Sequence, residues 1–548
     1  MRPRDRRIAA GCVLVLIASM AANAAFAEQR RSRQITIEPT DPAAPGATAP
    51  ALPAAPSGQP TPEAASPPPP SGGCETANFI GTKGMVEIVA ADLGRIQSVR
   101  AKTTRYLTLT HFANLCVDDG VLNVYRQAVI KLLNSLSRSS EVVRLETIDP
   151  RQSIIRINIA DLGWSAADWD AVLAVYPYGA LPDTALNAVL ERATQSKLAF
   201  VRGDWFAFAA SRPPLYGKLL ALPPTLRALA RDQGVDVEAN VKNFLAQRAG
   251  FQKSGESLNN RLVERHPSRA GYFWMTYDFA GNRGRQNLFE FPLGPSGDQG
   301  FAHDASAAIF SLPSGFQAYY QSNAKGDVAD RGPTQIVRDP NNPDLAVTTA
   351  ISCMGCHEGG VRAAADEIRA SALKGNQLPR STRDAIEGLY PAAEKMERLV
   401  EGDAARFSGA MVRASLDPTL KLAGVEMITA LSRQYERNVD ATFAAAELGL
   451  TPEEFAKNMG DADKKLRGFL RRLQQGPTPR DQFEAVFADL VDAITDDEAV
   501  RPAPPAKTAQ PAQPAQPAQP ARVSPPPTPT RAAPPPPPRG PGGYYYYR

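Results

Sequence analysis

The stretch Ile351-Ser-Cys-Met-Gly-Cys-His357 places two cysteines three positions apart and a histidine directly after the second one. Two thiols at this spacing lie on one side of a helical turn, where each can add to one of the two vinyl groups of a haem. The adjacent imidazole can then supply a nitrogen to the iron. The pattern therefore predicts one covalently attached haem c, bound through Cys353, Cys356 and His357.

Three other roles of this cysteine pair stay open. A redox-active dithiol expects a strand-to-helix setting inside a βαβ unit, and the surrounding sequence lacks that pattern. A zinc site needs four ligands, and the sequence offers no second cysteine pair or nearby histidine to complete them. The third role is a structural disulfide between Cys353 and Cys356. Covalent haem is favoured because its attachment takes place outside the cytoplasm, and the chain also carries an export signal.

That signal occupies residues 1–27. Four arginines precede an apolar run over residues 8–22, and Ala25-Phe26-Ala27 forms an A-x-A cleavage site. The apolar run is too short for a spanning helix, although an uncut membrane anchor stays the alternative. We expect a soluble, exported protein, located in the periplasm or otherwise outside the cytoplasm.

Proline-rich segments flank the predicted folded part. The linker at residues 28–73 holds 12 prolines from residue 34 onward, and the tail at residues 501–548 holds 17. Such segments lack the apolar surface to offset chain entropy, so we expect both to be disordered. The tail also carries six basic and no acidic residues, although the whole chain has a net charge of only +4. A basic tail on a mildly acidic body predicts no nucleic-acid binding, but it can associate weakly with an anionic membrane or cell wall.

Between these segments the pattern predicts an α+β multidomain protein. Residues 74–180 form an α/β module with strands at 85–91, 105–110 and 153–160 and a helix at 121–136, where apolar residues recur at helical spacing. Residues 181–345 begin helical and become β-rich, with an aromatic strand at 271–279. Residues 346–500 form a mainly helical region, in which Thr451-Pro452 begins a helix.

The motif and the export signal resemble those of c-type cytochromes. The flanking stretches Leu312-Pro-Ser-Gly-Phe-Gln-Ala-Tyr319 and Gly332-Pro-Thr-Gln-Ile-Val337 are similar to those of large exported bacterial proteins with a single cytochrome c motif. The likeness covers most of the core, and it implies that the helical region from residue 346 is cytochrome c-like. The likeness implies no defined activity. The only residues to which it assigns a role are those of haem attachment.

The second axial ligand of the iron is not fixed by the sequence. Single-haem cytochromes c place a methionine ligand downstream of the motif. Here Met396 is the first candidate, and the less favoured candidates are Met411, Met427 and Met459. Because Met396 and Met411 fall in helical patterns, core packing is their alternative role. The upstream alternative is His303, and the sixth position can also be open or occupied by water.

Two further cysteines remain in the core. Cys74 and Cys116 form an even pair in an oxidising compartment, which predicts a disulfide, with two free thiols as the alternative. His111 and His266 are expected to be structural.

Three function classes follow from these features. The first is electron transfer through one haem, with a redox protein as partner. The second is an enzyme in which the haem serves a peroxidase or a linked dehydrogenase, although no dinucleotide-binding G-x-G-x-x-G and no second haem motif is present. The third is a haem-based sensor that binds a small ligand at an open iron. Electron transfer is favoured, and catalysis is not.

Overall fold

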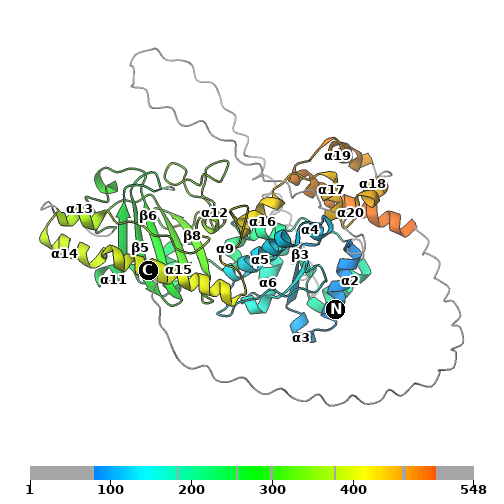
Figure 1. Cartoon of the computed structure of the whole chain (residues 1–548), viewed down its shortest axis with the longest axis horizontal. Helices are drawn as coiled ribbons and strands as arrows, with labels where there is room; N and C mark the ends of the chain where they lie inside the picture. The colour runs from blue at the N-terminus through cyan, green and yellow to red at the C-terminus, as the bar shows by residue number, and fades with distance from the viewer. Residues whose placement is uncertain are drawn as a thin grey trace, which may run out of the picture. The chain divides into compact units, whose positions relative to one another are not determined.

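The computed structural model describes residues 79–181, 184–254, 257–295, 300–374, 378–459 and 464–500. The predicted signal peptide, linker and basic tail lie outside the described residues, as does Cys74. The described part mixes helices and strands, which agrees with the predicted α+β class (Figure 1). No helix within those ranges combines the length and the apolar character needed to cross a membrane.

A three-stranded sheet forms from the N-terminal part of the chain. β1 (Thr104–Thr108) pairs antiparallel with β2 (Ile154–Asn158) and parallel with β3 (Phe200–Arg202), in the order β2-β1-β3. The long helix α5 (Asp119–Ser135) packs beside α8 (Gly203–Ala210). The strands predicted at 105–110 and 153–160 and the helix predicted at 121–136 are confirmed.

One prediction in this module was wrong. Residues 85–91 form part of helix α2 (Thr82–Leu93) and not a strand. Several β-branched residues favoured the strand, but the buried positions Met85, Val89 and Leu93 recur every four residues, as one face of a helix requires. Packing of that face overrode the local preference.

The second sheet has five strands joined as a simple antiparallel meander, in the order β4-β5-β6-β7-β8. The strands are β4 (Gln247–Phe251), β5 (Arg261–Ser268), β6 (Gly271–Asp278), β7 (Ala305–Ser311) and β8 (Gln317–Asn323). The predicted aromatic strand is β6, the middle strand. The sheet begins at Gln247, earlier than the sequence pattern indicated.

The remaining helices vary from four to twenty-one residues in length. Before the five-stranded sheet they are α3 (Ser98–Ala101), α4 (Thr110–Asn114), α6 (Ala166–Leu173), α7 (Thr184–Thr194), α9 (Leu215–Leu219), α10 (Leu226–Asp232) and α11 (Val237–Lys242). After it they are α12 (Ile351–Cys356), α13 (Ile368–Lys374), α14 (Arg380–Leu389), α15 (Ala393–Arg413), α16 (Met427–Tyr435), α17 (Ala441–Glu447), α18 (Pro452–Asn458), α19 (Lys464–Gln475) and α20 (Arg480–Val500). A short β9–β10 hairpin (Lys421–Leu422, Val425–Glu426) precedes α16. The predicted helix start at Thr451 is confirmed, with a capping box to Glu454.

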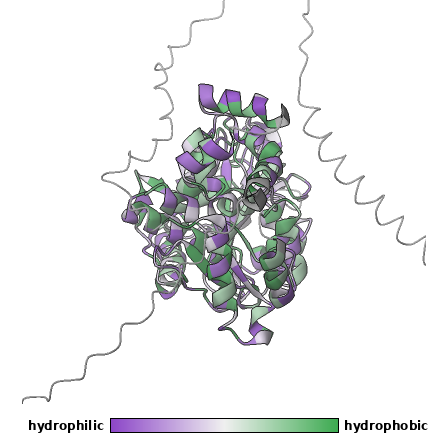
Figure 2. Cartoon of the chain, turned by 90° about the vertical axis from the view of Figure 1, so that its right-hand side faces the viewer, coloured by the Kyte–Doolittle hydropathy of each residue, from purple (hydrophilic) through white to green (hydrophobic). Residues whose placement is uncertain are grey.

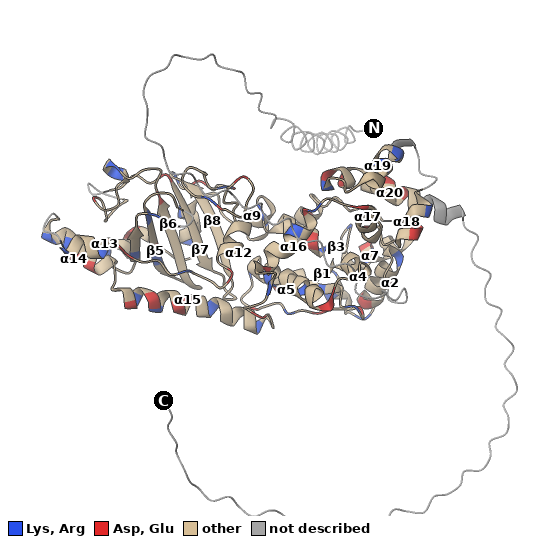
Figure 3. Ribbon diagram, turned by 45° about the horizontal axis from the view of Figure 1, so that its top comes forward, with Lys and Arg blue, Asp and Glu red and all other residues tan. Residues whose placement is uncertain are grey.

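The helices after the motif pack in two places. α15 lies along the five-stranded sheet, where Asp403 accepts hydrogen bonds from Arg265 of β5 and from the indole of Trp274 of β6 (Figures 1 and 3). α16 instead packs against α5 and α8, and α17 packs against α4. The predicted region 346–500 therefore contributes helices to both sheets, and its limits as a separate domain stay a prediction.

Polar and apolar residues are mixed along the outer helices, as amphipathic packing requires (Figure 2). Basic and acidic residues alternate along α15 (Figure 3).

Candidate functional site

The cysteine motif forms the short helix α12, which begins at a strained turn. Ala350, the residue before the helix, has φ +71° and ψ −67° and is fully buried. The amide of Ile351 donates to the carbonyl oxygen of Thr349 at 3.2 Å, which closes a γ-turn around Ala350. Backbone strain of this kind persists only where the surroundings fix it, and it clusters at functional sites.

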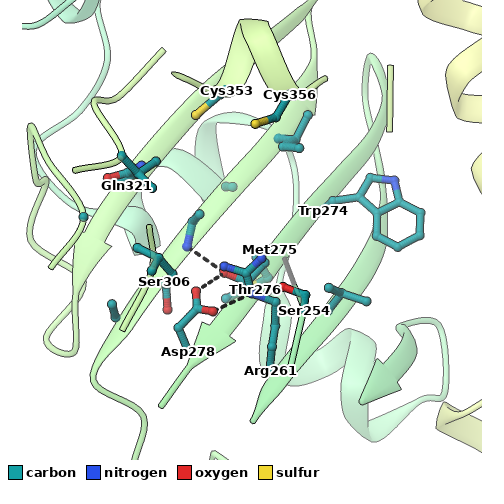
Figure 4. Close-up of a pocket in the computed structure, with 18 of the residues that line it drawn as sticks. Ser254, Arg261, Trp274, Met275, Thr276, Asp278, Ser306, Gln321, Cys353 and Cys356 are labelled. Atoms are coloured by element: carbon teal, nitrogen blue, oxygen red, sulfur yellow. Dashed lines mark hydrogen bonds and ion pairs between the residues drawn. The ribbon is translucent and has the colours of Figure 1, made fainter. Parts of the chain in front are cut away.

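Both thiols of α12 face one cavity. Cys353 and Cys356 are three positions apart, so they lie on the same side of the helix, and both sulfur atoms point toward the strands in Figure 4. The opposite side of the helix is packed: Met354 is buried, and Gly355 lies against the Thr429 side chain of α16. Both cysteines therefore line one cavity, and the attachment of a haem to them stays a prediction.

Burial raises the pKa of the Cys353 thiol to about 12. At neutral pH this thiol is protonated, whereas the reactive cysteine of a redox dithiol or a cysteine nucleophile needs a lowered pKa. The described residues also contain no group of three or more His, Cys, Asp or Glu side chains placed to hold a metal ion. The raised pKa of Cys353 weighs against the redox-dithiol alternative.

His357 ends the helix and has a defined tautomer. Its Nδ1 lies 3.1 Å from the carbonyl oxygen of Gly360. A carbonyl can only accept, so the hydrogen sits on Nδ1 and Nε2 carries the lone pair of the imidazole. Gly360 has φ +112°, and a β-carbon there would lie 3.0 Å from Ala404 of α15. Only glycine fits this turn, as the Gly359-Gly360 pair suggested.

The cavity has a volume of about 630 Å³, within the range typical of small-molecule and cofactor pockets. Cys353, Cys356 and His357 line it from one side. The five-stranded sheet lines the other side, through Val263, Trp274, Thr276, Ala307, Ile309 and Gln321 (Figure 4). The site thus lies between α12 and one face of the sheet.

Small side chains in the middle of the sheet leave this space open. Thr276 and Ala307 belong to central strands, yet they are only half-buried. The regular β6–β7 pairing is interrupted beside them, and the Thr276 hydroxyl accepts a hydrogen bond from the Ala307 amide at 2.9 Å. The adjacent Arg261 and Asp278 form an ion pair with 2.5 Å between Nε and Oδ1.

One buried polar atom on the cavity face of the sheet, Oε1 of Gln321, has no hydrogen-bond partner among the described residues. A buried polar atom without a hydrogen bond costs about 1–3 kcal/mol. This unpaired oxygen supports a site that is completed by a bound group.

Charged residues of both signs line the cavity. The cationic side chains are Lys253, Arg261, Arg331, Arg338 and Arg362, and the anionic ones are Asp278, Asp304, Asp339 and Glu367. Asp278 and Arg331 already hold ion-pair partners, Arg261 and Asp344 respectively.

The structure does not bring the predicted sixth ligands to the cavity. Met396 of α15 packs in a cluster with Trp274 and Val361, which line the cavity, whereas Met396 itself does not line it. Met411 is fully buried in the main core. His303 packs edge-to-face against Tyr277, with 5.1 Å between the ring centroids. Tyr277 points away from the sheet face that carries Thr276. The alternatives Met427 and Met459 are also core residues.

The disulfide prediction cannot be followed to both partners. Cys116 is held in a disulfide, whereas Cys74 lies outside the described residues, so the Cys74–Cys116 pairing stays a prediction. His266 is buried, with Nε2 2.9 Å from Glu264, as expected of a structural histidine.

Sequence reasoning missed the sheet half of the site. Trp274, Thr276 and Gln321 carry no motif, and only their alternation along β6 and β8 could have placed them on one face.

Comparison with known proteins adds no family assignment. No protein-family model matches the chain, and no match was found among curated proteins or solved structures.

Proposed function

We propose that this chain is an exported haem c protein that exchanges electrons through one covalently bound haem. The proposal is supported by one observation above all. Two cysteines and a histidine in C-x-x-C-H spacing line a single cavity of about 630 Å³ between α12 and a sheet. Neither a structural disulfide nor a zinc site requires such a space beside it.

The chain's own residues have distinct tasks in this proposal. Cys353 and Cys356 would form the two thioether bonds, each by adding its S–H across one vinyl group of the haem. His357 would supply an imidazole nitrogen to the iron, and its Nδ1–H donates to the Gly360 carbonyl. The bound haem would supply one-electron exchange. Lys253 and Arg338 are cationic lining residues suited to the carboxylates of its propionates.

A second candidate is a haem that binds a small ligand or peroxide. Among the described residues that line the cavity, His357 is the sole imidazole and Met275 the sole thioether. The Met275 sulfur accepts from the Tyr277 hydroxyl at 3.9 Å, on the far side of the sheet. With Met396, Met411 and His303 packed elsewhere, this arrangement favours an iron without a second protein ligand, as in a sensor or peroxidase.

The first experiment tests attachment. The full-length protein is expressed with cytochrome c maturation machinery and run on a haem-stained denaturing gel. We expect a stained band for the wild type and none for Cys353→Ala/Cys356→Ala. Met354→Leu, a substitution of similar volume inside the same motif, should keep the band. An unstained wild-type band would contradict haem attachment and would favour a disulfide or a metal site at the two cysteines.

The second experiment separates the two candidate functions. A six-coordinate, low-spin spectrum of the purified protein would favour electron transfer. A high-spin spectrum that changes on addition of cyanide or peroxide would favour ligand binding. A redox protein as partner, export to the periplasm and weak attachment of the basic tail to an anionic surface belong to the same proposal.

A further inference from the structure

A second cavity lies at the other sheet, away from the cysteine motif. Its volume is about 610 Å³, and it opens at the carboxyl ends of the parallel strands β1 and β3. Thr108 and Arg202, the last residues of these strands, are paired in register and both line it. The carboxyl ends of parallel strands are the usual place for ligands in open α/β sheets.

A buried ionic network forms one wall of this second cavity. Arg202 donates to both oxygens of Asp204, at 3.1 and 2.6 Å, and to Glu447 at 2.8 Å. Arg480 donates to both oxygens of Glu447, at 2.6 and 2.8 Å. The two arginines and two carboxylates balance in charge. The network is therefore neutral in charge, although Nη2 of Arg480 has no hydrogen-bond partner among the described residues.

His111 joins this network as a neutral imidazole. Burial lowers its pKa, although Asp204 opposes that shift. Its Nε2 lies 3.2 Å from the Asp204 carboxylate and 3.4 Å from Nη2 of Arg202. The sequence suggested a purely structural histidine, but His111 also lines the cavity.

The polar groups still available in the cavity are mainly donors. The Tyr176 oxygen accepts from the Arg202 amide at 3.1 Å, and its own hydrogen has no acceptor among the described residues. Lys83 is exposed and forms no ion pair within the same ranges. The lining carboxylates Glu447 and Glu454 already accept hydrogen bonds from Arg480 and from the Thr451 amide. A ligand with acceptor oxygens, such as a carboxylate, therefore matches this lining.

The rest of the lining is apolar. It includes Ile80, Leu181, Phe200, Phe487 and Ile494, contributed by segments at both ends of the described chain. Figure 1 shows α2, α4, α18 and α20 gathered on this side of the sheet. An amphipathic ligand, with a charged head and a short hydrocarbon body, would satisfy both kinds of surface.

We propose that the second cavity binds a small organic acid, with its carboxylate toward Lys83 and Tyr176 and its hydrocarbon part against the apolar wall. This site is independent of the haem and goes beyond electron transfer. It gives the part of the molecule around the three-stranded sheet a binding role of its own.

The test uses isothermal titration of the full-length protein with hexanoate, and with hexanol as the uncharged probe. We expect one saturable hexanoate site and at least tenfold weaker binding of hexanol. Lys83→Gln and Tyr176→Phe should each weaken hexanoate binding about tenfold. Lys102→Gln, a change at an exposed lysine that does not line the cavity, should leave it unchanged.

Two further variants keep the result decisive. Ala180→Trp places a large side chain at the cavity wall and should abolish hexanoate binding. Cys353→Ala/Cys356→Ala should bind hexanoate as the wild type does, which excludes a carboxylate bound to iron in the first cavity. Absence of saturable hexanoate binding would overturn the proposal, as would binding that survives both Ala180→Trp and Lys83→Gln.

Discussion

The Lys131 ammonium lies 3.0 Å from the Glu426 carboxylate, and both side chains are almost fully buried. The two residues are 295 positions apart and join α5 to the start of α16. Lys131 also donates to the carbonyl oxygen of Glu358, directly after His357, at 3.4 Å. Glu426 in turn caps α16 through the Thr429 amide. The pair therefore holds the loop that carries the predicted iron ligand.

Lys131→Met should destabilise the protein by about 3–5 kcal/mol, because it leaves the Glu426 carboxylate buried without a counter-charge. The double variant Lys131→Met/Glu426→Gln should recover most of this loss. Denaturant unfolding measures both changes. The control is Lys421→Met, which removes the half-exposed partner of the Glu358 side chain and should cost less than about 1 kcal/mol. If Lys131→Met and Lys421→Met lowered the free energy of unfolding equally, the buried pair would not have the role described here.

Alkylation of the haem-free, reduced protein should report the raised pKa of Cys353. With a pKa of about 12, roughly one thiol in ten thousand is ionised at pH 8, and the thiolate is the reactive form. The rate at Cys353 should therefore rise about tenfold per pH unit up to pH 11, as followed by iodoacetamide labelling and peptide mass. A rate that levels off near pH 8 would instead favour a redox-active dithiol.

Ala350→Gly should leave the fold intact and raise its stability by about 1 kcal/mol, because glycine adopts the positive φ of this γ-turn without strain. Ala350→Val should cost more than about 2 kcal/mol, since the site is fully buried and a β-branched residue is strained there. Thermal unfolding of the two variants gives the comparison. If valine were tolerated as well as glycine, the turn before α12 would not be strained.

Met396→Leu, Met411→Leu and His303→Gln should each leave the optical spectrum of the haem-loaded protein unchanged, because none of the three residues lines the first cavity. Loss of a low-spin spectrum in one of these variants would identify that residue as the sixth ligand. It would also require a rearrangement of its packing when haem binds.

Local signals in the sequence were sufficient for several parts of the fold. The capping box at Thr451 and the helical spacing of α5 depend on neighbouring residues, and both are present as predicted. The two cysteines and His357 also line one cavity, and the haem that their spacing predicts stays a prediction.

Long-range packing decided the features that the sequence did not predict. The helical form of α2 follows from burial of Met85 and Val89 against distant residues. The sheet wall of the first cavity, including Gln321, comes from strands that carry no motif. Met396 was the first candidate for the sixth ligand although it falls in a helical pattern, and in the structure it packs in a cluster with Trp274.

The central claim is that Cys353 and Cys356 hold one haem between them, and peptide mass spectrometry of the purified protein tests it most directly. Tryptic cleavage after Arg338 and Arg362 releases one peptide that contains both cysteines and His357. We predict that this peptide carries the mass of one haem, with no alkylatable thiol left after reduction. Recovery of the peptide with two free thiols after reduction, and without haem, from cells that mature other c-type cytochromes would contradict the account.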